Sequence, residues 1–216
     1  MKQIIVIGCG RFGASVSKTL TKLGHDVMVV DRDHDIVKEI AGYVAHAVQM
    51  DALDEASFRT IGLRNFDVAI VAIGSDIEAS IMATLIAKEA GVPVVIAKAQ
   101  HEIHGKLLTK IGADKVIYPE RDMGTRVAYG LVSQNILDVI EFSTDYSIVE
   151  IVALESWENK TLSELNLSRQ YAISVLAIKT GEKINIVPSF DTIIKKDDIV
   201  VILGNNAKLK KISEIE

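Results

Sequence analysis

The sequence predicts an α/β protein, with a doubly wound parallel Rossmann-like sheet followed by a small α+β domain. Short β-branched segments alternate with helix-length amphipathic segments from the start of the chain to about residue 118. The first apolar segment leads directly into glycines at positions 8, 10 and 13. Beyond residue 143 the pattern changes to closely spaced strand segments with one short helix. Six β-α units in the first pattern are typical of a doubly wound sheet.

The strands of the first domain are expected where apolar residues follow one another almost without interruption, as in parallel strands buried on both faces. These segments are residues 3–8, 26–30, 44–48, 67–73, 93–97 and 115–118. Helices are expected between them, over residues 11–23, 33–42, 53–62, 76–90 and 101–111. Four of these segments lead into a glycine that is typical of a helix end, at positions 24, 62, 91 and 112.

One long helix is expected over residues 120–141, because apolar residues recur there at helical spacing, at Val127, Leu131, Val132, Ile136 and Val139. The sheet is complete before this segment. Its apolar face is therefore expected to pack on a second subunit, and packing against its own sheet is the alternative. We assign this helix to the first domain, residues 1–142.

The second domain, residues 143–216, is expected to contain strands over residues 148–154, 173–179, 183–187 and 198–203. Its short helix should begin at Thr161, because Thr161 and Glu164 have the spacing of a capping box. Residues 180–182 are typical of a hairpin turn. No residue pattern in this domain indicates catalysis, which favours a regulatory role.

Composition excludes several classes of protein. The formal charge of −5 comes from 24 basic and 29 acidic residues with no basic arm, which argues against nucleic acid as a partner. No apolar run has the length of a membrane span, and no signal-peptide pattern opens the chain, so we expect a cytoplasmic protein. With one cysteine, no intrachain disulfide is possible.

The glycine-rich turn predicts a nucleotide site. Gly8 would make the tight turn after the first strand, Gly10 would let a pyrophosphate approach the backbone, and Gly13 would let the helix pack closely. The N-terminus of that helix would face the phosphate. Asp31, at the end of the second strand, would accept hydrogen bonds from ribose hydroxyls and repel a 2′-phosphate.

Two residues inside this turn have open roles. Arg11 is expected to bind a terminal phosphate, including that of a neighbouring subunit's nucleotide, with a solvated helix-start arginine as the alternative. Phe12 is expected to anchor the loop to the core, with stacking on a base as the alternative. These residues do not distinguish NAD from ADP or ATP, which share the adenosine and a phosphate chain.

The search for catalytic groups finds no nucleophile–base pair, so we expect a protein that is not an enzyme. His101 and His104 lie one helical turn apart, and we expect them on a surface helix rather than at a metal. Cys9 lies inside the glycine turn, where a helix N-terminus could lower its pKa, although the position needs only a small residue. A nicotinamide-dependent oxidoreductase and a stand-alone nucleotide or redox sensor remain the alternative functions.

The sequence resembles the KtrA/TrkA-type RCK proteins, the cytosolic gating subunits of bacterial potassium transporters, over essentially its whole length. The motifs that carry the resemblance are "VIGCGRFG" at 6–13, "VVDRD" at 29–33, "RNFDVAIVAIG" at 64–74, "AKAQ" at 97–100, "KIGADKVIYPERDMG" at 110–124 and "YSIVEIVA" at 146–153. The run from residue 110 to residue 124 is far more specific than the glycine pattern.

The resemblance implies that the first domain binds ATP or ADP, sometimes NAD(H), and forms dimers and an octameric ring beneath a membrane K⁺-translocating subunit of the KtrB/TrkH type. By position, Lys98 would point toward the phosphates, Arg11 would contact the neighbouring γ-phosphate, and Glu120 would hold a divalent cation such as Mg²⁺. The implied cofactor-binding set is Gly8, Gly10, Arg11, Phe12, Gly13, Asp31, Arg32, Asp51, Ala52, Ile73, Gly74, Lys98 and Glu120. Solvated strand-end charges are the alternative for Lys98 and Glu120.

The second domain resembles the RCK C-terminal module, which in some relatives binds cyclic di-AMP at a dimer interface. The candidate residues are Ile173, Ile184, Ile186 and Pro188, with Arg169 and Asn185 as polar partners. Ordinary core packing is the alternative for the apolar ones.

Overall fold

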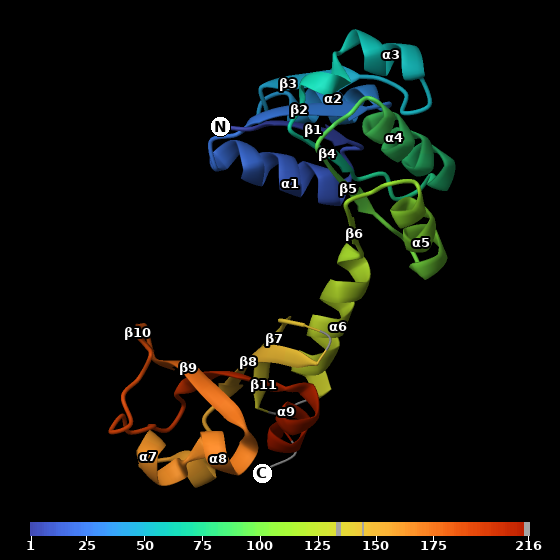
Figure 1. Ribbon diagram of the computed structural model, residues 1–216. Helices are drawn as coiled ribbons and strands as arrows, with labels where there is room; N and C mark the ends of the chain where they lie inside the picture. Colours follow the sequence, from blue (N-terminus) through green and yellow to red (C-terminus); the bar gives the residue numbers. More distant parts are fainter. Residues whose placement is uncertain (133–134, 144, 214–216) are drawn as a thin grey trace. The chain divides into compact units, whose positions relative to one another are not determined.

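The computed structural model describes residues 1–132, 135–143 and 145–213, and the chain divides into two compact units, Met1–Glu120 and Arg121–Glu216 (Figure 1). Each unit has its own sheet and its own hydrophobic core. The predicted class is confirmed, since a parallel Rossmann-like sheet is followed by a small antiparallel sheet with helices.

The first unit is a six-stranded parallel sheet with the order β3-β2-β1-β4-β5-β6. Its strands are β1 (Gln3–Ile7), β2 (Asp26–Asp31), β3 (His46–Gln49), β4 (Val68–Val71), β5 (Val94–Lys98) and β6 (Lys115–Ile117). Its helices are α1 (Arg11–Lys22), α2 (His34–Ile40), α3 (Glu55–Thr60), α4 (Ile77–Glu89) and α5 (Glu102–Lys110), with a 3₁₀ turn η1 (Leu63–Asn65). The predicted strands and helices of this region are therefore all present, with small shifts in their bounds. Each of the four helix-end glycines has a positive φ.

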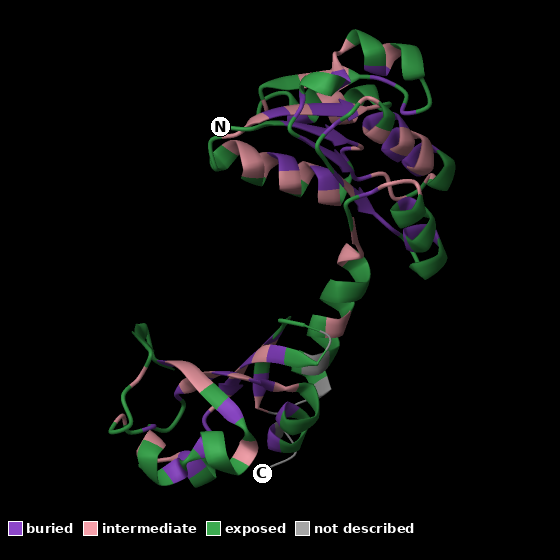
Figure 2. Cartoon of the chain, in the orientation of Figure 1, coloured by how far each residue is buried: buried purple, intermediate pink, exposed green. Residues whose placement is uncertain are grey.

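The sheet is covered on both faces, which explains why its strands are almost continuously apolar. Alternate residues of β1 enter different cores: Ile4 and Val6 pack with side chains of α1 and α2, whereas Ile5 and Ile7 pack with those of α3, α4 and α5. Figure 2 shows the strands as the most continuously buried part of this unit. Burying one such side chain contributes about 1.5–3 kcal/mol, so the two cores stabilise the sheet on both of its faces.

The helix expected over residues 120–141 is only partly correct. Helix α6 covers Pro119–Val132, and Ile136–Glu141 form strand β7, which pairs with the second unit's sheet through β8 (Tyr146–Val152). The expected boundary at residue 142 would place residues 136–141 in the first domain. They instead belong to the sheet of the second unit. Among the described residues, no helix is both long enough and apolar enough to cross a membrane.

The second unit is built on an antiparallel sheet with the order β10-β9-β11-β8-β7. Its further elements are η2 (Glu155–Trp157), α7 (Leu162–Leu165), α8 (Leu167–Tyr171), β9 (Ile173–Thr180), β10 (Lys183–Ile186), β11 (Ile199–Asn205) and α9 (Asn206–Ser213). The four predicted strands and the predicted hairpin between β9 and β10 are present. Sequence reasoning missed α8, α9 and β7. The core contains Trp157, a large and fully buried side chain, and Leu209 and Ile212 of α9 pack into it.

The predicted capping box is present at the start of α7. The Glu164 N–H donates to Thr161 Oγ1 at 3.1 Å, and the Thr161 N–H donates to Glu164 Oε2 at 2.8 Å. Two backbone N–H groups at the start of this short helix are thereby satisfied.

We expect Thr161→Ala to lower the free energy of unfolding by about 1 kcal/mol, because one of these N–H groups loses its acceptor. Urea denaturation of the full chain measures this. Ser163→Ala, at an exposed position of the same helix, is the control and should change the value by less than about 0.5 kcal/mol. Equal losses in the two variants would contradict a stabilising role for the capping box.

Candidate functional site

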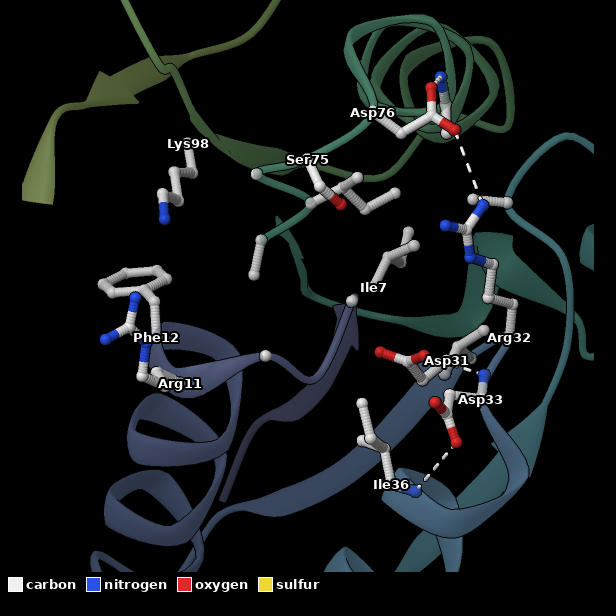
Figure 3. Close-up of a pocket in the computed structure, with 18 of the residues that line it drawn as sticks. Ile7, Arg11, Phe12, Asp31, Arg32, Asp33, Ile36, Ser75, Asp76 and Lys98 are labelled. Carbon is white, nitrogen blue, oxygen red and sulfur yellow. Dashed lines mark hydrogen bonds and ion pairs between the residues drawn. The ribbon is translucent and has the colours of Figure 1, made fainter.

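A cavity of about 620 Å³ lies at the carboxyl ends of the parallel strands, where the turns after β1, β2, β4 and β5 meet (Figure 3). The strand order reverses between β1 and β4, so the chain leaves these neighbouring strands toward opposite faces of the sheet. In open α/β sheets this reversal creates the crevice in which ligands bind. The cavity is therefore where the fold alone would place a site.

The residues predicted to bind the cofactor line this cavity, with the exception of Gly13, which is buried at the start of α1. Sequence reasoning missed four further polar lining residues, Asp33, Ser75, Asp76 and Gln100. Each follows the end of a parallel strand by a few residues. That position, rather than any motif, is the signal that could have identified them.

The first turn of α1 differs from the first turns of α2 to α5. Gly10, the residue before α1, has no side chain to cap the helix, and the turn contains no acidic residue. Helices α2, α3, α4 and α5 instead begin at capping side chains that accept backbone N–H groups, namely those of Asp33, Asp54, Asp76 and His101. The unmet N–H groups of α1 border the cavity, which is the local geometry of a phosphate site.

Two glycines give this turn its shape. Gly8 has a φ of +93°, a conformation that other residues rarely adopt. A Cβ on Gly13 would lie only 2.0 Å from the Gly8 carbonyl oxygen, so α1 packs directly on the turn. Nothing lies within 4 Å of the position that a Cβ would take on Gly10, which leaves room for a ligand beside the backbone.

Asp31 ties the glycine turn to the end of β2. Its Oδ2 accepts the Cys9 N–H at 2.6 Å and its Oδ1 accepts the Asp33 N–H at 2.9 Å. A carboxylate has about four lone-pair positions, so Asp31 retains capacity for donors from a ligand in the cavity. Asp31 is thus a positioning residue for the turn as well as a candidate ligand-binding residue.

The cavity end beside α1 is cationic. Lys98 is 9% exposed, and its Nζ lies 2.5 Å from Glu120 Oε1. The hydrogen bond from Lys98 lowers the pKa of Glu120, and the charge of Arg11 contributes in the same direction. Figure 3 shows Arg11 and Lys98 on the same side of the cavity. Two cations thus face one carboxylate here, next to the positive end of the α1 dipole.

The opposite end is acidic. Four carboxylates line it, those of Asp31, Asp33, Asp51 and Asp76, together with the guanidinium of Arg32. Arg32 Nη1 lies 3.6 Å from Asp76 Oδ2. The cavity therefore has two ends of opposite charge, separated by the apolar and glycine residues of the β1 and β4 turns.

The position of Phe12 is compatible with both of the roles that the sequence left open. It is half-buried and packs against the core beneath α1, as expected of an anchor. It also lines the cavity, where Lys98 Nζ lies 5.9 Å from its ring centroid. This distance is at the outer limit of a cation–π contact.

The structure corrects the expectation for His104, which is not on a surface but 2% exposed. Its Nδ1 accepts the Gln100 N–H at 3.3 Å, and the His104 N–H is in turn accepted by His101 Nδ1 at 3.2 Å. A neutral imidazole whose Nδ1 accepts must carry its proton on Nε2, which then has no lone pair for a metal. Within the described residues there is no group of three or more His, Cys, Asp or Glu residues that could hold a metal ion.

Cys9 is likewise buried, at 4% exposure. Burial raises the pKa of its thiol to about 11, and the nearby charge of Asp31 adds to this effect. The lowered pKa that a helix N-terminus could have produced is therefore absent at this residue. The neutral thiol that results is a poor nucleophile.

The candidates in the second unit do not form one group. Ile173 belongs to the hydrophobic core, where it is 2% exposed, as the core-packing alternative requires. Ile184 and Ile186, on the edge strand β10, are instead 62% and 73% exposed. Asn185 and Arg169 are also exposed, and Pro188 is half-buried.

The fold and the cavity together define the class of the protein: a Rossmann-type nucleotide-binding module followed by a small antiparallel module. Residues 4–119 match the TrkA-N domain and residues 146–215 match the TrkA-C domain. The chain belongs to the KtrA/TrkA-type family of RCK proteins, the regulatory subunits of bacterial potassium uptake, as its motifs predicted.

Two curated relatives support this assignment. The chain is 46% identical over 204 residues to Ktr system potassium uptake protein C of Bacillus subtilis (strain 168), covering 94% of this chain and 92% of that protein. It is 42% identical over 210 residues to Ktr system potassium uptake protein A of the same organism, covering 97% and 95%. Among solved structures, the GsuK channel bound to NAD has a TM-score of 0.69 at 17% identity. That alignment covers 96% of this chain and 38% of the channel, so this chain spans well under half of the channel's length.

We expect Gly13→Ala to lower the free energy of unfolding by roughly 3 kcal/mol or more, because the new methyl group would overlap a backbone oxygen. Gly10→Ala is the matched control. Its backbone has a φ of −63° and its Cβ position is open, so the change should stay within about 1 kcal/mol. Urea denaturation measures both variants, and equal stability of the two would show that the turn is not packed as described.

The stability of the first unit should depend on pH through His104. Burial, with a smaller contribution from His101, lowers the pKa of His104. As the pH falls through about 6.5, the unfolded chain therefore binds a proton at this residue before the folded chain does, and stability decreases. His104→Asn should flatten the dependence of the unfolding free energy on pH between about 5.5 and 7.5. The exposed His46→Asn is the control, and a slope unchanged by His104→Asn would contradict the assignment.

Proposed function

We propose that this protein is a cytoplasmic regulatory subunit that binds ATP or ADP in the cavity of the first unit. Through it, the bound nucleotide gates K⁺ uptake by a membrane-embedded K⁺-translocating partner of the KtrB/TrkH type. The observation that carries the proposal is the polarity of the cavity. One end offers cations and the uncapped first turn of α1, and the other offers carboxylates.

An adenosine phosphate has matching polarity. Its phosphates would lie on the backbone N–H groups at Gly10–Gly13 and beside Lys98, while its ribose hydroxyls would donate to Asp31. Lys98 is buried, so its charge needs an anion close by. Glu120 provides that anion within the chain, and a phosphate could share or replace it. NAD(H) presents the same adenosine, and the GsuK channel structure bound to NAD supports it as the alternative ligand of this fold.

A divalent cation such as Mg²⁺ is part of the proposal. Mg²⁺ is usually bound by one or two carboxylates together with phosphate oxygens and water. Glu120 fits this requirement, since its side chain is 68% exposed and it borders the phosphate end of the cavity. Glu120 would hold the cation only with phosphate oxygens as further ligands, because one carboxylate alone is a weak site. Bound there, the cation would neutralise phosphate charge.

Regulation would proceed by a shift between two shapes of an assembly. ATP and ADP would bind the same cavity but contact a neighbouring subunit differently, and only such a difference in contacts can shift an equilibrium. Arg11 is exposed at the first position of α1, as a residue that reaches a neighbour's γ-phosphate must be. Met123, Val127 and Leu131 are exposed at four-residue spacing on α6, which supports self-association as a dimer and a homo-octameric ring.

Cyclic di-AMP is proposed as a second ligand, at the exposed part of the second unit. Ile184 and Ile186 could cover its purines, and Asn185 could hydrogen bond to it. Ile173, being core, is left out of this proposed site, and the exposed Arg169 stays a candidate.

Arg11→Ala should weaken ATP binding about tenfold more than ADP binding, because the arginine would lose a charge-assisted hydrogen bond to the γ-phosphate. Isothermal titration calorimetry of the assembled protein measures both affinities. Arg64→Ala is the control, since it removes the same charge from an exposed position that does not line the cavity.

Titration of the wild-type protein with ATP, ADP and NADH, together with an absorbance assay of NADH, tests the function itself. A preference for NADH, with substrate-dependent loss of its absorbance, would overturn the gating proposal in favour of an oxidoreductase. An ATP-to-ADP affinity ratio that Arg11→Ala leaves unchanged would overturn only the role of Arg11. Binding of neither nucleotide would overturn the proposed function.

A further inference from the structure

Arg32 and Asp76 lie on different turns of the first unit and meet across the acidic end of the cavity. Arg32 follows Asp31 at the end of β2, and Asp76 is the residue before α4. Figure 3 shows the Arg32 side chain extending away from Asp31 toward Asp76, where Nη1 and Oδ2 are 3.6 Å apart. Both residues line the cavity.

Hydrogen bonds hold the backbone around Arg32 in place, so a change of ion-pair partner would involve only its side chain. Gln49 Nε2 donates to the Arg32 carbonyl at 3.1 Å, and the Met50 N–H donates to the Asp31 carbonyl at 2.9 Å. On the other side, the Asp33 N–H donates to Asp31 Oδ1. The Arg32 side chain is 67% exposed, and it forms its ion pair with Asp76.

A second contact, the helix cap of α4, holds the Asp76 side chain in place. Its Oδ1 accepts the Ala79 N–H at 3.0 Å and so caps α4, while its Oδ2 faces Arg32. The cap orients the carboxylate at no cost to the ion pair, because the two contacts use different oxygens. Asp76 is also less exposed than Arg32, at 31% for its side chain.

An arginine close to the ribose-binding acid is the group that accommodates a 2′-phosphate in NADP-binding sites, since its donors match phosphate geometry. Arg32 has that sequence position, directly after Asp31. We propose that Asp76 is a specificity-determining residue of this cavity: it holds Arg32 away from the 2′ position, so that the site takes adenosine with a free 2′-hydroxyl and rejects 2′-phosphorylated nucleotides. This inference rests on the proposed binding of an adenine nucleotide.

Loss of negative charge alone could also admit a 2′-phosphate, and the chain contains a matched control for that effect. Asp33 lines the same end of the cavity and caps α2 through its Oδ1, as Asp76 caps α4. Asparagine caps helices about as well as aspartate. Asp33→Asn and Asp76→Asn therefore remove the same charge and keep a helix cap, but only Asp76→Asn releases Arg32.

The experiment compares 5′-AMP with adenosine 2′,5′-bisphosphate, which differ only in the 2′-phosphate, by calorimetric titration of the full chain. We expect Asp76→Asn to shift the affinity ratio about five- to tenfold toward the bisphosphate. Asp33→Asn should shift it by no more than about twofold, because a solvent-exposed charge is screened. Adding Arg32→Ala to Asp76→Asn should abolish the larger shift.

Two results would overturn the inference: a ratio that Asp76→Asn leaves unchanged, or equal shifts in Asp76→Asn and Asp33→Asn. Either result would leave the proposed function standing, provided that 5′-AMP binds the wild-type protein. If the wild-type chain binds neither compound and also fails to bind ADP, the proposed function is overturned instead. Circular dichroism and thermal unfolding of each variant verify that the helix caps are intact.

Discussion

The functional edge of the first unit depends on one constraint, the unmet hydrogen-bonding capacity of the first turn of α1. A glycine at its start supplies no capping side chain, and Asp31 fixes the preceding turn by accepting the Cys9 N–H. The close contact between Gly8 and Gly13 then holds the start of the helix against the end of β1. An anion at this place satisfies backbone groups that the chain itself leaves unsatisfied. The order of the strands also brings Lys98 and Asp76 to this edge. Charged side chains therefore surround the unsatisfied N–H groups at the start of α1.

Most of the fold could be predicted because the central parallel strands β1, β2, β4 and β5 are largely buried and read as apolar runs. The prediction fails at residues 136–141 for a specific reason. Ile136 and Val139 are three residues apart, which favours a helix, and in a regular strand they would face opposite sides. A β-bulge between Ile136 and Asp138 shifts the register, so both side chains enter the core while Leu137 and Ile140 stay exposed. The bulge depends on pairing with β8, which is not visible in the local sequence.

The candidate site could likewise be predicted only in part. The glycine turn and Asp31 are local features, so their arrangement follows from a short stretch of chain. Asp76 and Gln100 reach the cavity because β4 and β5 follow β1 in the sheet, so only their position after a strand end, and no local motif, indicates their place. His104 illustrates the limit for buried polar groups. At the start of α5 its Nδ1 accepts the Gln100 N–H, while its Nε2 is buried without a hydrogen-bond partner among the described residues, although helical periodicity would place the side chain in water.

The charges of the cavity are already paired within the chain at both ends, Lys98 with Glu120 and Arg32 with Asp76. A ligand that binds Lys98 or Arg32 must compete with these pairs, so its affinity includes the difference between the contacts it forms and those it replaces. For a nucleotide bound as proposed, this difference would depend on the number and position of its phosphates, because they would compete with Glu120 for Lys98. Replacing the Lys98–Glu120 pair has larger consequences than replacing the Arg32–Asp76 pair. Lys98 is buried and cannot be left without an anion, and Glu120 is where α6 leaves the first unit toward β7. If the cavity binds nucleotides as proposed, this competition favours discrimination between related nucleotides over tight binding of any one of them, as a regulatory subunit requires.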